Sequence, residues 1–286
     1  MLEIIPSTVN INFVSKFKFT VILSLVMLLA SLFLIFGKGL NYGVDFRGGA
    51  EIQVKFNTIV EAGRLRDVFD SIGHGSAVVQ SIGSSTTQSE FLVRVQANEK
   101  NLNEVTTAIS HALEESFTSE GADIRRTDIV GPKAGAELRS SGVKAMFYAV
   151  LAIMIYIGLR FDFKYSPGAI LALMHDVIIV LGVFALFDIE FTLQIVAALL
   201  AVIGYSVNDT VVIYDRVRDH EAIAPSTPLV HHINQSANET LSRTLFTAGT
   251  TLIVSLAMYF FGGESIEEFF LAISLGIVIG TYSSMF

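Results

Sequence analysis

The segment FTLQIVAALLAVIGYSVNDTVVIY, Phe191–Tyr214, is long and apolar enough to cross a lipid bilayer. Asp209 is the only ionisable acid within it, and the next apolar run, Leu241–Phe261, contains a single cation, Arg243. A charge inside a membrane span costs at least about 2.5–3.5 kcal/mol on insertion scales. We therefore expect the two charged residues to be kept for a function, and the sequence favours proton movement.

The composition supports a membrane protein with several spans. Of the 286 residues, 52% are apolar and only 16% are charged. The chain has no cysteine, which excludes disulfides, thiol catalysis and cysteine-based zinc sites. A net charge of −8 argues against nucleic acid as a partner.

Six apolar runs reach, or nearly reach, the length of a membrane helix. They are Phe19–Phe36, Ala145–Leu159, Gly168–Phe187, Phe191–Tyr214, Leu241–Phe261 and Phe269–Phe286. The first is too long for the apolar part of a signal peptide and lacks an A-x-A cleavage site, so we interpret it as an uncleaved anchor. The expected division is an N-terminal segment (1–18), a first helix (19–36), a domain outside the membrane (37–141) and five further helices (142–286).

The short loops predict the orientation of these helices. One set of loop ends is basic, with Lys16, Lys18, Arg160, Lys164, Arg216 and Arg218, whereas the loops at 188–190 and 262–268 have no Lys or Arg. The basic set is expected in the cytoplasm. Both termini would then be cytoplasmic, and residues 37–141 would be periplasmic.

Residues 37–141 have the pattern of one small α+β domain. Alternating apolar residues predict strands at 51–56, 77–82, 91–95 and 122–130, with a polar SSTTQSE turn at 84–90, and helical spacing predicts helices at 59–72 and 102–117. This βαββαβ order is that of a ferredoxin-like fold. Such a fold hosts many functions and decides none.

GVDFRGG, Gly43–Gly49, precedes this domain. We predict a turn in which Gly48 and Gly49 supply positive φ before the first strand. A second interpretation is that Asp45 and Arg47 also anchor the domain at the level of the lipid headgroups.

Asp209 and Arg243 are expected at matched depth on antiparallel helices, about 10–12 Å from the midplane on the cytoplasmic side. Contact between them would favour the ionised carboxylate, and separation would favour the neutral acid. A driving force of about 150 mV supplies about 3.5 kcal/mol per proton, which biases a two-state equilibrium about 300-fold. The alternative is that Arg243 simply extends toward the interface.

Polar side chains near this pair predict either a hydrated path or tight packing. The candidate lining residues are Tyr205, Asn208, Thr247 and Thr251. In the alternative, the hydroxyls bind the carbonyls of the preceding helical turn. Asp176, beside His175 at the middle of its span, is a further candidate for proton transport, and a purely structural network is its rival. We expect no metal site and no cofactor.

A set of motifs in this chain resembles the SecD/SecF family of bacterial protein-export membrane proteins, and its SecF members in particular. The motifs are GVDFRGG (43–49), VGP (130–132), MHD (174–176), GYSVNDTVVIYDRVR (204–218), NETLSRT (238–244) and GTYSS (280–284). The resemblance runs from the first helix to the last. Each motif is weak alone, whereas the ordered set is specific.

The resemblance implies a six-helix half of an RND-type transporter that pairs with SecD and associates with the SecYEG channel, with YajC and YidC as further partners. It implies use of the proton-motive force for late stages of preprotein export across the inner membrane. It ties Asp209 and Arg243 to proton flow and assigns Asp176 no definite role. The resemblance also implies a short cytoplasmic tail after the last helix, beyond Phe286, where the given sequence ends.

Two other functions compete with this one. An RND-type exporter of small molecules or lipids shares intramembrane charges and an external domain, but usually has twelve spans in one chain. An intramembrane hydrolase needs an H-E-x-x-H helix or a pair of aspartates, and this chain has no H-E-x-x-H. Because Asp176 and Asp209 are predicted to differ in depth by about 10 Å, we expect no enzyme activity.

Overall fold

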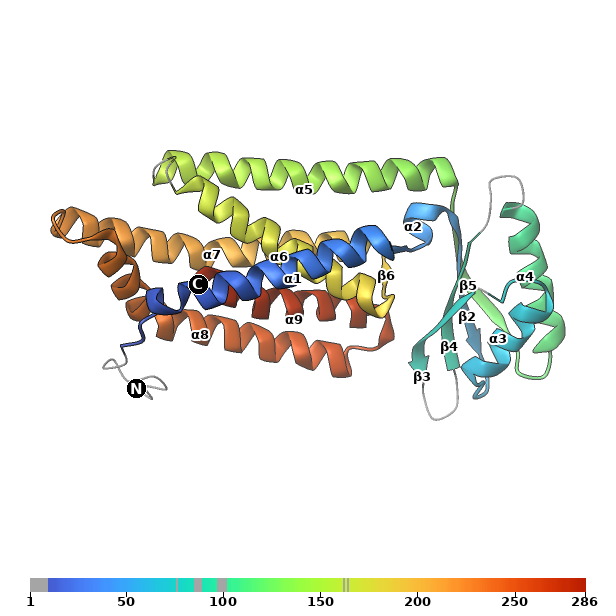
Figure 1. The fold of residues 1–286 in the computed structure, drawn as a ribbon. Helices are drawn as coiled ribbons and strands as arrows, with labels where there is room; N and C mark the ends of the chain where they lie inside the picture. Colours follow the sequence, from blue (N-terminus) through green and yellow to red (C-terminus); the bar gives the residue numbers. More distant parts are fainter. Residues whose placement is uncertain (1–9, 76, 85–88, 97–101, 162, 164) are drawn as a thin grey trace.

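The computed structural model describes residues 10–75, 77–84, 89–96, 102–161, 163 and 165–286. Long helices form a bundle, and a small α+β domain lies at one end of it (Figure 1). Lys164 and most of the predicted SSTTQSE turn lie outside the described residues. We call the end of the bundle next to the α+β domain the domain-side end.

Six helices in the described part of the chain are long and apolar enough to cross a membrane. They are α1 (Phe17–Gly37, preceded by the 3₁₀ turn η1, Val14–Lys16), α5 (Pro132–Arg160), α6 (Ser166–Phe187), α7 (Leu193–Ile223), α8 (Leu229–Phe261) and α9 (Glu264–Met285). α7 and α8, with 31 and 33 residues, are about 46–50 Å long. They therefore extend beyond a hydrocarbon layer of about 30 Å.

The predicted boundary at residue 142 falls inside α5, which begins at Pro132. Proline favours the first position of a helix because it lacks only an N–H that would be unpaired there. The first turns of α5 are polar, so hydrophobicity alone places the start of the helix too late.

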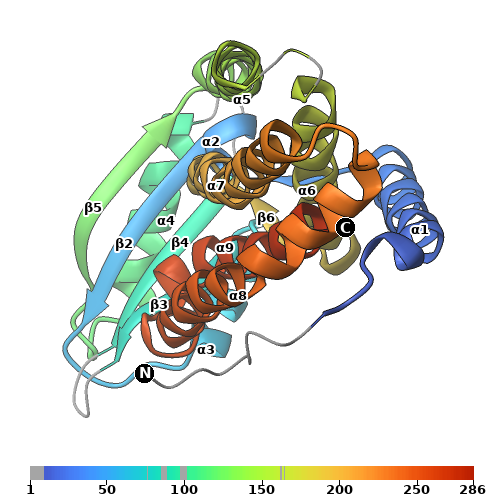
Figure 2. The same cartoon turned by 90° about the vertical axis from the view of Figure 1, so that its left-hand side faces the viewer.

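α7 lies in the middle of the bundle. It packs against α6, α8 and α9, and its buried face contributes Ile195, Leu199 and Ile203 to the main apolar core. α1 packs on α6 at one side of the bundle, and α5 lies at another side (Figure 2). Asp209 is thus carried by the most enclosed helix.

The α+β domain has the predicted order of strands and helices. Its elements are β2 (Gly49–Phe56), α3 (Ala62–Ser71), β3 (Val78–Ser84), β4 (Ser89–Gln96), α4 (Leu102–Ser116) and β5 (Asp123–Val130). The strands form one antiparallel sheet in the order β3-β4-β2-β5. Alternate residues of β2, such as Ile52 and Val54, are buried under the helices. The other face carries polar residues and is the one that meets the bundle through Arg94.

The predicted turn at Gly43–Gly49 is instead a one-turn helix, α2 (Val44–Arg47). The Phe46 and Arg47 N–H groups both donate to the carbonyl of Gly43, which closes the turn. Within the motif, Gly48 (87°) and Gly49 (155°) have positive φ, directly after this helix. The prediction that Gly48 and Gly49 supply positive φ before the first strand is confirmed. The helical turn that precedes them was not predicted.

A short parallel pair of strands joins α2 to the start of α7. β1 (Asn41–Tyr42) pairs with β6 (Glu190–Phe191). β6 leads directly into α7, so the domain-side end of α7 is held to the segment that enters the α+β domain.

Candidate functional site

Asp209 is buried in the bundle, with 2% of its surface exposed. Within the described part of the chain, its Oδ2 atom has no hydrogen-bond partner. A buried polar atom is normally hydrogen-bonded, since leaving it unpaired costs about 1–3 kcal/mol. An exception of this kind is common where a group changes its state during function.

The charge that acts on Asp209 is that of Arg243. α7 and α8 pack against each other, but no ion pair within 4 Å joins the two side chains in the described structure. Arg243 is exposed and lines a cavity of about 300 Å³ together with Arg160, Asp215 and Glu239. The acid is enclosed, and the cation reaches a polar cavity away from the α+β domain.

Two expectations were given for the predicted lining residues: a hydrated path, or tight packing with hydroxyls bonded to the carbonyls of the preceding turn. The Thr247 and Thr251 hydroxyls donate to carbonyls one turn earlier in α8, at 3.1 and 2.8 Å, which is the packing alternative. The Tyr205 hydroxyl lies near both threonines, yet it is buried without a hydrogen bond among the described residues. Asn208 is exposed on the free face of α7. The threonine hydroxyl oxygens can still accept a hydrogen bond from a donor.

Asp176 forms a network that joins three helices. Its Oδ2 accepts hydrogen bonds from Ser206 of α7 (2.7 Å) and Ser283 of α9 (2.9 Å). Its Oδ1 lies 3.0 Å from Nδ1 of His175, and only 1% of its side chain is exposed. Ser206 lies three residues before Asp209, so this network and Asp209 share one stretch of α7.

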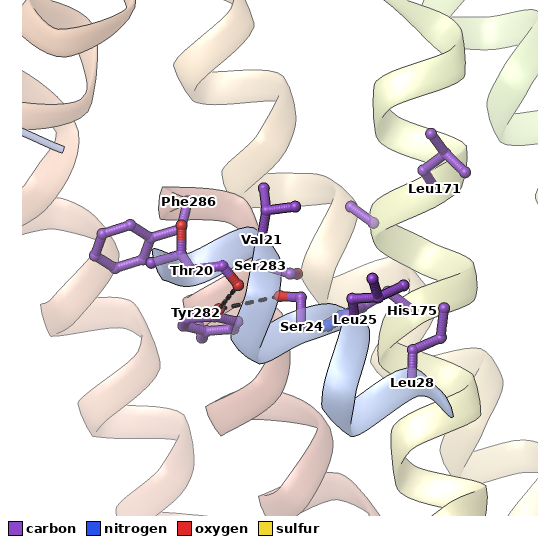
Figure 3. A pocket seen from close by; sticks show the side chains of 11 residues that line it. Thr20, Val21, Ser24, Leu25, Leu28, Leu171, His175, Tyr282, Ser283 and Phe286 are labelled. Carbon is purple, nitrogen blue, oxygen red and sulfur yellow. Dashed lines mark hydrogen bonds between the residues drawn. The ribbon is translucent and has the colours of Figure 1, made fainter. Parts of the chain in front are cut away.

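A cavity of about 290 Å³ between α1, α6 and α9 opens beside this network (Figure 3). The Tyr282 hydroxyl donates to the carbonyl of Thr20 at 2.8 Å and lies 3.0 Å from the hydroxyl of Ser24. His175 also lines this cavity, and its Nε2 is buried without a partner in the described structure. Ser206, Ser283 and Tyr282 lie in the motifs at 204–218 and 280–284. They were not predicted as site residues because a hydroxyl in an apolar helix gives no local sign of its partner.

The glycine pair of the GVDFRGG motif allows close packing at the junction. A Cβ on Gly48 would lie 2.7 Å from the nitrogen of Pro132, and one on Gly49 would overlap the carbonyl oxygen of Val95. Arg47 contacts the side chain of Gln96 at 3.4 Å. The lack of a side chain at Gly48 thus allows the start of α5 to pack against it, and the lack of one at Gly49 allows β2 to lie close to β4.

Asp45 of the same motif holds the first turn of α7. Its Oδ2 accepts the Leu193 N–H at 2.9 Å, and a carboxylate at this position complements the positive end of the helix dipole. This contact gives Asp45 a role that its predicted headgroup position did not include.

The described residues contain no group of three His, Cys, Asp or Glu side chains that could hold a metal ion.

The class of protein follows from the fold and the site. The described part of the chain has six long apolar helices, an α+β domain inserted after the first, and an enclosed acid near a cation. Together these define a multi-pass helical membrane protein with an intramembrane charge site.

Comparison with known proteins identifies the family. The model for "Protein export membrane protein SecD/SecF, C-terminal" matches residues 109–286, and the "SecD/SecF GG Motif" model matches residues 33–58. The chain belongs to the SecD/SecF family of protein-export membrane proteins.

Curated relatives match over nearly the whole chain. The protein translocase subunit SecF of Calditerrivibrio nitroreducens is 41% identical over 99% of this chain and 93% of its own length. The SecF subunit of Pseudomonas aeruginosa is 38% identical over 97% of this chain and 89% of its own.

Two solved structures share the fold. The crystal structure of SecDF from Thermus thermophilus has a TM-score of 0.81 and 34% identity over 98% of this chain. SecDF in a super-membrane-facing form has a TM-score of 0.72 and 34% identity over 100% of it. This chain spans 38% of the length of each SecDF chain.

Proposed function

We propose that this chain is a non-enzymatic auxiliary subunit of the Sec protein translocase, which uses the proton-motive force to promote late stages of preprotein export across the inner membrane. The near full-length similarity to SecF subunits supports the export role. The observation that carries the proton step is Asp209, which is buried near the charge of Arg243 and has an oxygen without a hydrogen-bond partner among the described residues.

The proposed proton step couples charge to helix contact. When Asp209 is ionised, attraction draws it toward Arg243; when it carries a proton, that attraction is lost. Water in the cavity that Arg243 lines would give protons access from the end of the bundle with the basic loops. Asp176 is proposed as a second proton carrier, and Tyr205, Asn208, Thr247 and Thr251 as the lining of the path.

The proposed partner is SecD, which would supply the remainder of the SecDF architecture that this chain covers in part. SecYEG, the translocating preprotein, YajC and YidC are proposed as further partners. The basic loops support a cytoplasmic location for both termini and a periplasmic one for the α+β domain. The strand order β3-β4-β2-β5 supports a ferredoxin-like fold for that domain.

The test is Asp209→Asn, co-expressed with SecD, in membrane vesicles with an imposed proton gradient. We expect proton-dependent stimulation of preprotein export to be lost while SecD still co-purifies, because asparagine keeps the shape and cannot exchange the proton. Glu221→Gln is the matched control, since Glu221 lies on the same helix, outside the cavity that Arg243 lines, and accepts a hydrogen bond from the Tyr165 hydroxyl at 2.6 Å. Full stimulation in Asp209→Asn would refute the role of Asp209. Proton flux that needs a small molecule or lipid but no preprotein would favour the exporter.

A further inference from the structure

A buried ion cluster joins the α+β domain to the domain-side end of the bundle. Arg94 of β4 contacts Glu51 of β2 through Nε at 2.8 Å and Glu190 of β6 through Nη1 at 3.0 Å. The side chains of Arg94 and Glu190 are each 9% exposed. Glu51 belongs to the same sheet as Arg94, whereas Glu190 belongs to the link between α6 and α7. Arg94 therefore bridges two parts of the molecule.

The cluster holds more acid than base. The charges that act on Arg94 include those of Glu51, Glu190 and Glu268 of α9. Asp45 of α2 also acts on Glu190, and Glu267 acts on Glu268. One guanidinium cannot neutralise three to five neighbouring carboxylates, and like charges held this close repel one another. A bound proton relieves that repulsion.

A cavity of about 530 Å³ at the same interface reaches the α9 side of the cluster, at Glu267 and Glu268. Gln80 of β3 lines the side of the α+β domain, while Glu267 and Glu268 line the side of α9. The cavity has room for water, which needs polar partners of this kind. Protons can therefore exchange with the cluster while the α+β domain is docked.

The cluster is linked directly to α7. Glu190 lies in β6, three residues before the first residue of α7, and Asp45 accepts the Leu193 N–H. A change in the contact between Arg94 and Glu190 thus acts on the segment that positions the helix of Asp209.

We propose that docking of the α+β domain onto the domain-side end of the bundle takes up a proton, which Glu190 and Glu268 hold around Arg94. In the docked state, the bound proton reduces the excess negative charge of the cluster. Loss of the proton drives the α+β domain away from the bundle and releases the start of α7.

The electrostatics of Glu190 give the sign of the pH dependence. Burial raises the pKa of the Glu190 carboxyl, and the attraction of Arg94 offsets this only in part. When undocked, Glu190 is hydrated and its pKa is ordinary. The docked form therefore keeps a proton at pH values where the undocked form has lost it, so docking is favoured at low pH. It weakens as the pH rises through the raised pKa of the docked form.

The test is a distance measurement on the full chain in lipid nanodiscs. The sequence has no cysteine, so Glu115→Cys on α4 and Phe261→Cys at the end of α8 take spin labels selectively. Both positions are exposed and lie outside the cluster. We expect one short distance near pH 5 and a growing longer distance toward pH 9. For one proton, the ratio of docked to undocked molecules changes by up to about tenfold per pH unit.

Three variants assign the effect to named groups. The double variant Glu190→Gln, Glu268→Gln should stay docked at every pH, because the amides mimic protonated acids. In the Arg94→Gln variant, the α+β domain should dock only at a lower pH than in the parent chain, because the remaining carboxylates lose their counter-charge. Glu120→Gln is the matched control, because Glu120 pairs with Arg64 inside the α+β domain, and it should titrate like the parent.

Each outcome decides the proposal. A distance that is the same from pH 5 to pH 9 in the parent chain would overturn it, and so would undocking on acidification. A double Gln variant that titrates like the parent would overturn the assignment to Glu190 and Glu268. These readouts use no export assay, so they stand apart from the translocase role.

Discussion

At the scale of single residues, Asp209 and Arg243 differ in their surroundings more than their sequence positions indicate. Asp209 is enclosed, whereas Arg243 is exposed and lines a polar cavity. An acid–base pair that is near but not bonded can make and break contact with a small helix movement. The geometry is therefore suited to a switch rather than to a fixed ion pair, which would need both partners in direct contact.

Arg243→Gln tests the cation of this pair. We expect proton-dependent export to fall about tenfold or more, the factor that corresponds to the loss of about 1.4 kcal/mol of coupling. The measurement is export into vesicles with and without a proton gradient. Arg243→Lys keeps the charge and should retain part of the stimulation. Equal losses in the Lys and Gln variants would show that charge is not the property that matters.

Asp176→Ala tests the network of α6, α7 and α9. It leaves the buried Ser206 hydroxyl without its acceptor, whereas the Ser283 hydroxyl also bonds the carbonyl of Gly280. Unpaired buried donors cost about 1–3 kcal/mol, so we expect a lower thermal unfolding temperature in detergent.

Asp176→Asn separates a proton carrier from a structural anchor, because the amide keeps one acceptor oxygen and cannot release a proton. If Asp176 carries protons, the Asp176→Asn variant should be more stable than Asp176→Ala but should show weak proton-coupled export. Normal export by a stable Asn variant would leave Asp176 as an anchor only.

At the scale of elements, the junction of α2, β2 and α5 depends on its two glycines. Gly49→Ala would place a Cβ against the carbonyl oxygen of Val95, and β2 would have to move away from β4. We expect a loss of about 1–3 kcal/mol in the free energy of unfolding, in the range of strained backbone positions.

Gly63→Ala is the matched control for the junction. Gly63 lies within α3, and a Cβ there would meet no atom within 4 Å. Alanine is the better helix former by about 0.5–1 kcal/mol, so this variant should be neutral or slightly stabilising. Hydrogen exchange of β2 and β4 measures both variants. Unchanged exchange in Gly49→Ala would show that the sheet accommodates the added carbon.

At the scale of the whole molecule, α7 has one face that the described chain leaves uncovered. This face carries amides and small residues at helical spacing: Gln194, Ala197, Ala201, Gly204 and Asn208. Small residues allow helices to approach closely in membranes. We expect the proposed SecD subunit to pack here, next to Asp209.

Gly204→Leu tests this contact without disturbing the chain itself, because an added Cβ at Gly204 meets no atom within 4 Å. We expect less SecD to co-purify. Ala30→Leu is the control, since Ala30 is exposed on α1, which packs on α6. Normal recovery of SecD with Gly204→Leu would place the interface elsewhere.

The sequence by itself determined the membrane helices, the order of elements in the α+β domain and the two intramembrane charges. These follow from local rules: apolar length, the two-residue period of strands and the high cost of a charge in lipid. The start of α5 and the helix at Val44–Arg47 were misjudged because polar or glycine-rich helical turns carry a weak local signal.

Only the tertiary structure decided which polar groups meet. Asp176 meets Ser206 and Ser283 from helices that lie 30 and 107 residues away, and Arg94 meets Glu190 across 96 residues. Such contacts depend on how helices and sheet pack in three dimensions, and no periodicity along the chain encodes them. In the part of the chain that the structure describes, the same packing leaves the Asp209 Oδ2 atom without a partner, which its sequence motif alone could not reveal.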